Sequence, residues 1–251
     1  MKQSNGKVRL SVETFYDNIS KNKEKTKVDS KELSKSLGYE EEVINQFPEE
    51  INMGLSCGNP IHHLKIKEGQ SLIDLGCGGG LDIFITKMKN PKVGTLYGLD
   101  RLDSMLEKAR KVCDKKNFKN IEFIKGELID IPLQEKTVDR VISNCVINLE
   151  PNKQKVYDEI YRILKDDGMF VISDIVLKKE LPLEWKNSER MLCTCVAGAI
   201  LEEEIVDIVK KAGFKKFQII NSEVTDEYSE KWGYGEEIKD YIQSGLLIGR
   251  K

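Results

Sequence analysis

Histidine is scarce in this chain of 251 residues: it has only two, His62 and His63, and they are adjacent. Zinc sites built from several histidines, and catalytic triads whose histidine stands apart from its partners, therefore lack the residues they need. We interpret the pair as a feature of a helix face and not as ligands.

Long apolar segments are also missing. The longest unbroken apolar run is Met169–Ile172, whereas a membrane-spanning helix needs about 20 apolar residues. The N-terminal segment, residues 1–15, has no apolar stretch of the kind found in secretory leaders. We therefore expect a cytoplasmic location and no membrane partner.

Neither sign of charge is in clear excess. The chain has 40 Lys and Arg against 42 Asp and Glu, a formal net charge of −2. Because no global positive field results, we expect no nucleic-acid partner. We expect a monomer.

Six cysteines are present, but no pair has the C-x-x-C spacing of a zinc ribbon, and Cys193-Thr-Cys195 is the only close spacing. Disulfides rarely persist in the cytosol, which argues against a disulfide scaffold. The cysteines are therefore either inert core residues or ligands that the fold brings together. They stand at positions 57, 77, 113, 145, 193 and 195.

From residue 70 onward, short apolar segments alternate with amphipathic ones. Strands are predicted at 71–75, 94–99, 121–125, 138–143, 168–177, 214–221 and 245–249, and helices at 81–88, 104–116, 153–164 and 202–212. This alternation predicts an α/β fold, a parallel seven-stranded Rossmann-like sheet with helices on both faces. A ligand should bind beyond the carboxyl ends of the strands.

Three regions are expected. Residues 1–60 form an N-terminal helical cap, with helices at 8–20 and 29–37, and end in a turn-rich loop that carries Cys57. Residues 61–180 form the Rossmann-like core that would bind the cofactor. Residues 181–251 complete the sheet, and within them the polar segment 223–244 is an insertion between the last two strands.

A glycine-rich loop follows the first predicted strand and precedes a helix. It reads Asp74-Leu-Gly76-Cys-Gly78-Gly-Gly80. Glycines let a ligand approach the backbone closely, and the helix start offers free N–H groups. The dinucleotide fingerprint fails because Leu81 stands at its third glycine position. The pattern D-x-G-x-G-x-G instead resembles motif I of class I S-adenosylmethionine (SAM) methyltransferases.

Other strand ends fit the same resemblance. Asp100 ends the second strand, where a carboxylate can accept both ribose hydroxyls, and the Gly126-Glu127-Leu128 segment follows the third strand, where related enzymes contact adenine. We therefore predict a SAM site. Its residues are Asp74, Gly76, Gly78, Gly80, Asp100, Glu127, Leu128 and Asn144.

Three cysteine-bearing segments narrow the family: Asn52–Pro60 (NMGLSCGNP), Ser143–Leu149 (SNCVINL) and Cys193–Ala199 (CTCVAGA). Together, over residues 8 to 222, they resemble the arsenite methyltransferases. The resemblance implies that Cys57, Cys145 and Cys195 hold arsenic(III) as substrate and are the catalytic residues.

The implied chemistry suits these residue types. Soft metals and metalloids select thiolates. Arsenic bound by three thiolates keeps a lone pair that can attack the SAM methyl group without a general base, which fits the scarcity of histidine. Successive rounds would methylate arsenite and then methylarsenite, an arsenic detoxification.

The chain departs from the family in one respect. Many members carry a further cysteine in the N-terminal segment, thought to pair with the Cys-Gly-Asn-Pro thiol, but residues 14–30 contain none. A thiol reductant such as glutathione or thioredoxin, or Cys193, would then regenerate the site, and arsenite could arrive as an arsenic-thiol conjugate. Cys77 and Cys113 are interpreted as core residues.

Two alternatives remain open from the sequence. A small-molecule C- or O-methyltransferase of the quinone or sterol type would use the same fold and SAM loop without needing the thiols. A non-catalytic thiol protein that binds metalloids would need the cysteines but not the SAM loop.

Overall fold

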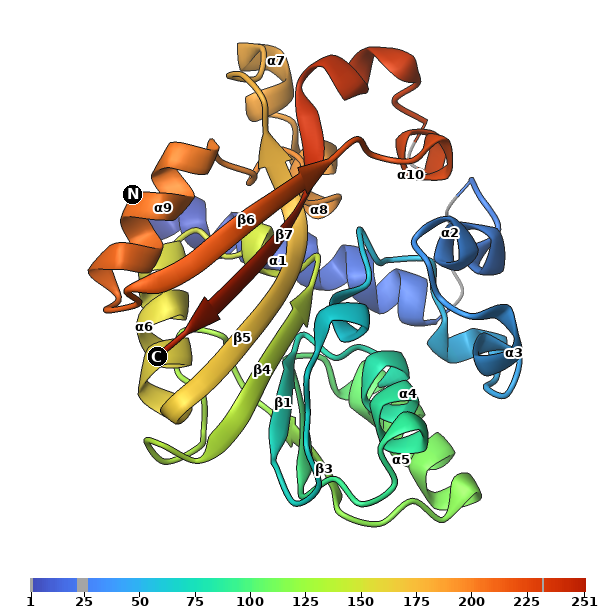
Figure 1. Ribbon diagram of the computed structural model, residues 1–251. Helices are drawn as coiled ribbons and strands as arrows, with labels where there is room; N and C mark the ends of the chain where they lie inside the picture. The colour runs from blue at the N-terminus through green and yellow to red at the C-terminus, as the bar shows by residue number, and fades with distance from the viewer. Residues whose placement is uncertain (1, 22–26, 232) are drawn as a thin grey trace.

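The computed structural model describes residues 2–21, 27–231 and 233–251, with side chains from residue 10. In these residues one seven-stranded sheet has the order β3-β2-β1-β4-β5-β7-β6 (Figure 1). This confirms the predicted fold class. The strands are β1 Leu72–Leu75, β2 Leu96–Asp100, β3 Ile121–Lys125, β4 Val138–Asn144, β5 Leu164–Leu177, β6 Lys216–Ser222 and β7 Ile242–Arg250.

The sheet is mixed, so the expectation of a wholly parallel sheet was wrong at β7. Strands β1 to β5 pair in parallel, but β7 lies antiparallel between β5 and β6. Ser222 at the end of β6 pairs with Ser244 near the start of β7, so the chain turns back at the same edge. A parallel β7 would have required a crossover to the opposite edge.

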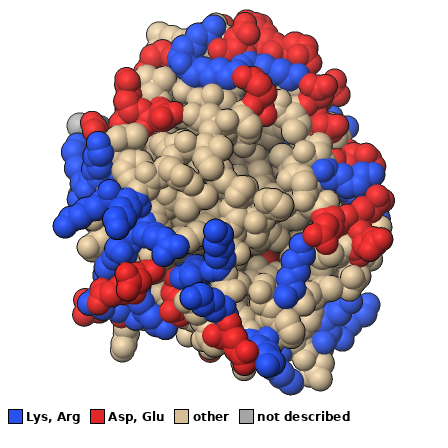
Figure 2. Space-filling view, viewed as in Figure 1, with Lys and Arg blue, Asp and Glu red and all other residues tan. Residues whose placement is uncertain are grey.

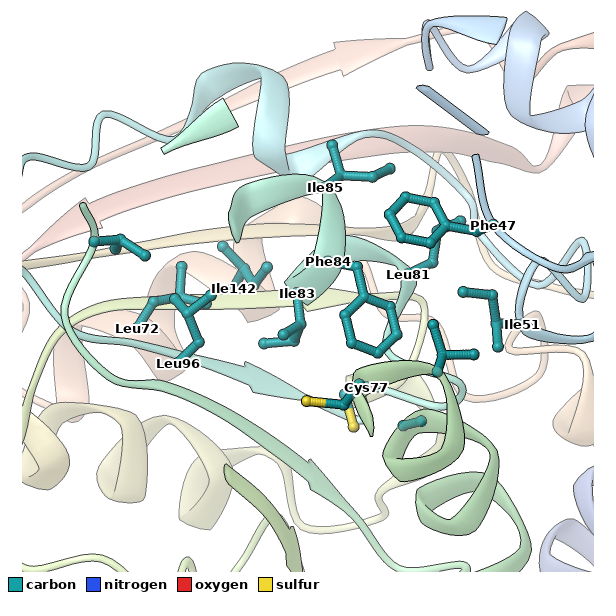
Figure 3. Packing of buried hydrophobic residues seen from close by; sticks show 14 of the residues in the cluster. Phe47, Ile51, Leu72, Cys77, Leu81, Ile83, Phe84, Ile85, Leu96 and Ile142 are labelled. Carbon is teal, nitrogen blue, oxygen red and sulfur yellow. The ribbon is translucent and has the colours of Figure 1, made fainter. Parts of the chain in front are cut away.

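Helices cover both faces of the sheet. The side chains of β1 alternate between two apolar clusters, with Leu72 packing toward α4 and α5 and Ile73 toward α6 and α9. Figure 3 shows the first cluster, in which Phe84 stacks on Phe47 from the N-terminal region, and Cys77 lies among the same residues. These helices are α4 Leu81–Lys89, α5 Asp103–Lys116, α6 Lys153–Ile163 and α9 Glu202–Lys211.

Apart from α1, the remaining helices are short. Helix α1 packs against α5 and α8, and α2 packs against α10. His62 and His63 are exposed in the short helix η2. None of the described helices combines the length and apolar character of a membrane span. The bounds are α1 Lys2–Ser20, α2 Ser30–Ser36, α3 Glu41–Ile44, η1 Glu49–Ile51, η2 Pro60–His63, η3 Ile147–Leu149, α7 Leu183–Lys186, α8 Glu189–Cys193, α10 Asp226–Lys231 and η4 Glu236–Asp240.

Candidate active site

Three cysteines far apart in the sequence meet in one buried cluster. Cys57 lies in the loop before η2, Cys145 directly follows β4, and Cys195 follows α8. The Cys195 thiol donates to the carbonyl oxygen of Cys145 at 2.9 Å, and the Cys57 thiol donates to that of Ser173 at 3.5 Å. The structure therefore places the three predicted arsenic ligands together.

Two of these cysteines have a strained backbone. Cys145 has φ 59° and Cys195 has φ 67°, in the left-handed region that side chains other than glycine rarely adopt. Such conformations cost about 1–3 kcal/mol each and are concentrated at functional sites. The folded structure thus keeps both thiols in orientations that the local backbone would not favour.

The glycines of the cysteine motifs allow this packing. A Cβ atom at Gly58 would lie 1.8 Å from the Ser173 hydroxyl oxygen, and one at Gly198 would lie 1.9 Å from the Asn148 carbonyl oxygen. Both contacts are far shorter than van der Waals separation, so larger residues would push the cysteine loops off the sheet.

The three thiols differ in acidity. The neighbouring thiols of Cys195 and then Cys57 hold the pKa of Cys145 well below its ordinary value. Burial and then the neighbouring Cys145 raise the pKa of Cys57, whereas Cys145 and then burial raise that of Cys195. Cys145 is therefore the most acidic of the three thiols.

Asp174 lies beside the thiols, a position that sequence reasoning missed. The sulfurs of Cys57 and Cys145 and a carboxylate oxygen of Asp174 lie within 4.8 Å of one another. The carboxylate accepts from the Asn148 side chain at 2.8 Å and from the Ile175 N–H at 2.9 Å. Its sequence signal was a carboxylate inside the apolar half of β5, where Met169–Leu177 contains only Ser173 as another polar residue.

Helix α10 supplies two further residues that the sequence did not indicate. Lys231 is 1% exposed, and its Nζ donates to the carbonyl oxygens of Leu55 (3.3 Å) and Ser56 (3.0 Å), just before Cys57. Its ammonium lies 4.5 Å from the ring centroid of Tyr228, which is equally buried. No local pattern could reveal this, because α10 is more than 160 residues from the loop it supports.

A cavity runs from the glycine loop to Cys145. It occupies about 800 Å³, its open mouth included, and is walled by α1 as well as by the strand ends. Burial raises the pKa of the Asp100 carboxyl in its wall, and this carboxylate accepts from the N–H groups of Gly78 and Leu102, both at 2.9 Å. The predicted residues that line it are Gly76, Gly78, Asp100, Leu128 and Asn144.

The other three predicted cofactor residues do not line this cavity. Asp74 is buried within β1, and Gly80 is the N-cap of α4 with φ 83°. The Glu127 carboxylate forms an ion pair with Arg101. Asp74 and Gly80 therefore support the glycine loop, and the Glu127 carboxylate points toward Arg101.

Asn144 links the cavity to the cysteine cluster. Its side-chain amide donates to the Gly58 carbonyl oxygen at 2.9 Å and to the Tyr39 hydroxyl at 3.0 Å, and its oxygen accepts from the Cys57 N–H at 3.2 Å. The Tyr39 hydroxyl in turn donates to Asp82 of α4 at 2.8 Å. The loop that carries Cys57 is therefore tied directly to the end of β4.

The remaining cysteines lie in other surroundings. Cys77 and Cys113 pack in the apolar cluster under α4 and α5. Cys193 is buried at the end of α8, two residues before Cys195.

Residues 66–213 match a family model described as a methyltransferase domain. The chain belongs to this methyltransferase family. The match covers the glycine loop, whereas the wall of the strand-end cavity also includes residues of α1 that lie before it.

Individual relatives agree with the resemblance carried by the cysteine segments and confirm it. A protein of Halobacterium salinarum named arsenite methyltransferase is 33% identical over 87% of this chain, which spans 56% of that relative's length. The crystal structure of CrArsM, an arsenic(III) S-adenosylmethionine methyltransferase from Chlamydomonas reinhardtii, has TM-score 0.64 at 27% identity, covering 86% of this chain and 72% of that one.

A more distant neighbour shares the fold alone. Phosphoethanolamine N-methyltransferase 2 of Haemonchus contortus, solved in complex with S-adenosyl-L-methionine, has TM-score 0.64 at 17% identity and covers 74% of this chain and 50% of that one.

Proposed function

We propose that this protein transfers a methyl group from SAM to trivalent arsenic held by Cys57, Cys145 and Cys195. The observation that carries the proposal is the position of Cys145, which lines the strand-end cavity and also belongs to the buried thiol cluster. An acceptor bound there faces the cavity in which the methyl donor would lie. The similarity to arsenite methyltransferases supports the choice of acceptor.

Arsenic binding is a ligand exchange. Neutral arsenous acid has three As–O bonds, and each is replaced by an As–S bond while the oxygen leaves as water. The three protons required come from the thiols, and a proton from solvent replaces that of any thiol already ionised. Soft thiolate sulfur stabilises the product.

Methyl transfer then needs positioning more than acid–base chemistry. The arsenic lone pair forms a bond to the methyl carbon while the carbon–sulfur bond of SAM breaks, and its electron pair stays on sulfur as S-adenosylhomocysteine. Holding the two reactants in line can supply much of the rate enhancement. Residues proposed to hold the donor are Gly76, Gly78, Asp100, Leu128 and Asn144 along the cavity, with Asp74, Gly80 and Glu127 around it.

The transfer oxidises arsenic from the trivalent to the pentavalent state. Two electrons must return before another round, and two thiols supply them by forming a disulfide. We assign this role to an external reductant such as glutathione or thioredoxin, with Cys193 as the internal candidate. A Cys193→Ser variant that keeps full multiple-turnover activity would leave the external thiol as the reductant.

The test is incubation of the full chain with arsenite, SAM and glutathione, with methylated arsenic detected by mass spectrometry and a Cys145→Ser variant as control. Product above the control supports the proposal. If small-molecule acceptors are methylated equally well after all three cysteines are replaced, the protein is a carbon or oxygen methyltransferase. Stoichiometric arsenic binding without SAM consumption would instead identify a sequestering protein.

A further inference from the structure

The hydroxyl of Tyr228 is buried without a hydrogen-bond partner in the part of the chain that the structure describes. Tyr228 is 1% exposed and belongs to the same apolar cluster as Cys57, Cys145 and Cys195. Nearly all buried hydroxyls in folded proteins are paired, because leaving one unpaired weakens folding. An unpaired hydroxyl beside a candidate active site therefore points to a ligand that pairs with it.

The hydroxyl of Tyr228 is a hydrogen-bond donor. Tyrosine is protonated at neutral pH, so this hydroxyl can donate a hydrogen bond. The Nζ of Lys231 lies 4.5 Å from the ring centroid. The group that a ligand meets is thus a protonated hydroxyl close to the thiols.

A second cavity gives a ligand a way to this residue. Tyr228 and Cys57 both line it, and it lies between the ends of β6 and β7 on one side and α2 and α10 on the other (Figure 1). Hydroxyl side chains of Ser36, Ser222 and Thr225 share its wall. On the face seen in Figure 2, charged side chains gather mainly around the rim and leave most of the centre uncharged.

We propose that the Tyr228 hydroxyl binds substrate by donating a hydrogen bond to the last oxygen on arsenic, at the stage where two thiolates are already attached. The inference rests on the proposed arsenic chemistry and assigns a role to α10. In the next step the third thiol forms its As–S bond and the As–O bond breaks. The thiol proton moves to the departing oxygen, water leaves, and Tyr228 keeps its own proton. A donor at that oxygen stabilises the charge developing on it.

The test compares the uptake of two forms of arsenic by the wild type and by the Tyr228→Phe variant, which lacks only the hydroxyl. Arsenic uptake by the full chain, without SAM, is followed by rapid filtration and mass spectrometry. With arsenite alone, losing one hydrogen bond should slow uptake about tenfold in the variant. In excess glutathione, where arsenic arrives as a thiol conjugate without oxygen, variant and wild type should take it up at equal rates.

A stability measurement and a matched variant exclude a merely structural role. Since the hydroxyl is unpaired, Tyr228→Phe should leave the melting temperature unchanged or raise it by about 2–4 °C. Tyr157→Phe, a buried tyrosine in the cluster under α6 and α9, should take up both forms of arsenic at the wild-type rate.

Three outcomes count against the inference. Equal uptake of free arsenite by wild type and Tyr228→Phe would overturn it while leaving the proposed function standing. An equal slowing with the oxygen-free conjugate would make Tyr228 a packing residue and also overturn it. A wild-type chain that takes up no arsenic in either form would overturn the proposed function itself.

Discussion

The thiol of Cys195 donates to the main-chain carbonyl oxygen of Cys145 at 2.9 Å, across 50 positions of sequence. This bond joins the segment after α8 to the end of β4. Cys195 must release the carbonyl oxygen to bind arsenic, so ligand binding exchanges this hydrogen bond for an As–S bond. The predictions below follow from this cluster and from the cavity next to it.

The three thiols should not be equivalent to substitution. Cys145→Ser and Cys195→Ser should abolish methylation of both arsenite and methylarsenite, because a hydroxyl is a hard ligand and binds arsenic weakly. Cys57→Ser should chiefly affect arsenite, which has three exchangeable positions. Product analysis by mass spectrometry checks this, with Cys113→Ser in the distant core as control. Full arsenite methylation in all three variants would contradict a three-thiolate site.

Arsenite binding should take up a proton at any pH above the pKa of the Cys145 thiol. The neighbouring thiols of Cys195 and Cys57 lower this pKa, so Cys145 is the first of the three to ionise, while the arsenic complex needs three protons for three departing waters. Affinity should therefore rise about tenfold for each unit of falling pH until Cys145 itself becomes protonated, below which it should level off. Calorimetry in buffers of different ionisation enthalpy measures this uptake; a value of zero would mean that Cys145 rests as a thiol.

Replacing Asp100 by alanine should weaken SAM binding by about tenfold or more, the loss expected for a buried charged hydrogen-bonding group. The change also frees the N–H groups of Gly78 and Leu102, so the glycine loop should loosen. Arsenic affinity should stay unchanged in the same titrations by calorimetry. Asp103→Ala, which removes a carboxylate from an exposed ion pair with Lys125, is the matched control and should bind SAM normally.

Glu127 should contribute less to SAM binding than its position in the sequence suggests. Its carboxylate pairs with Arg101, and its neighbours Gly126 and Leu128 supply the cavity wall. Glu127→Gln should therefore change the dissociation constant of SAM by less than about threefold, in the range expected for a partly exposed ion pair. A loss as large as that of Asp100→Ala would show that Glu127 turns to contact the donor.

Local patterns were sufficient for the framework of this protein. Apolar periodicity located the strands and the helices between them, and the glycines from Gly76 to Gly80 marked the loop at the first strand end. The cysteine segments indicated Cys57, Cys145 and Cys195 because each segment is a short contiguous motif that can be recognised without the fold. The expected strand at 168–177 was too short, since β5 begins at Leu164.

Other features depended on contacts that no local pattern contains. Strand β7 begins beside the end of β6, and this makes it antiparallel to both β5 and β6. A short apolar segment has the same pattern in either direction, so the sequence could not show this. Asp174 faces the thiols because β5 pairs with β4, and Lys231 and Tyr228 reach them because α10 packs against α2. The acidity of Cys145 likewise arises from two thiols that only the fold brings near. Residue types thus determined what chemistry this chain can carry, while tertiary packing decided which thiol is the most acidic and placed the Tyr228 hydroxyl beside the cluster, because both depend on distances between segments far apart in sequence.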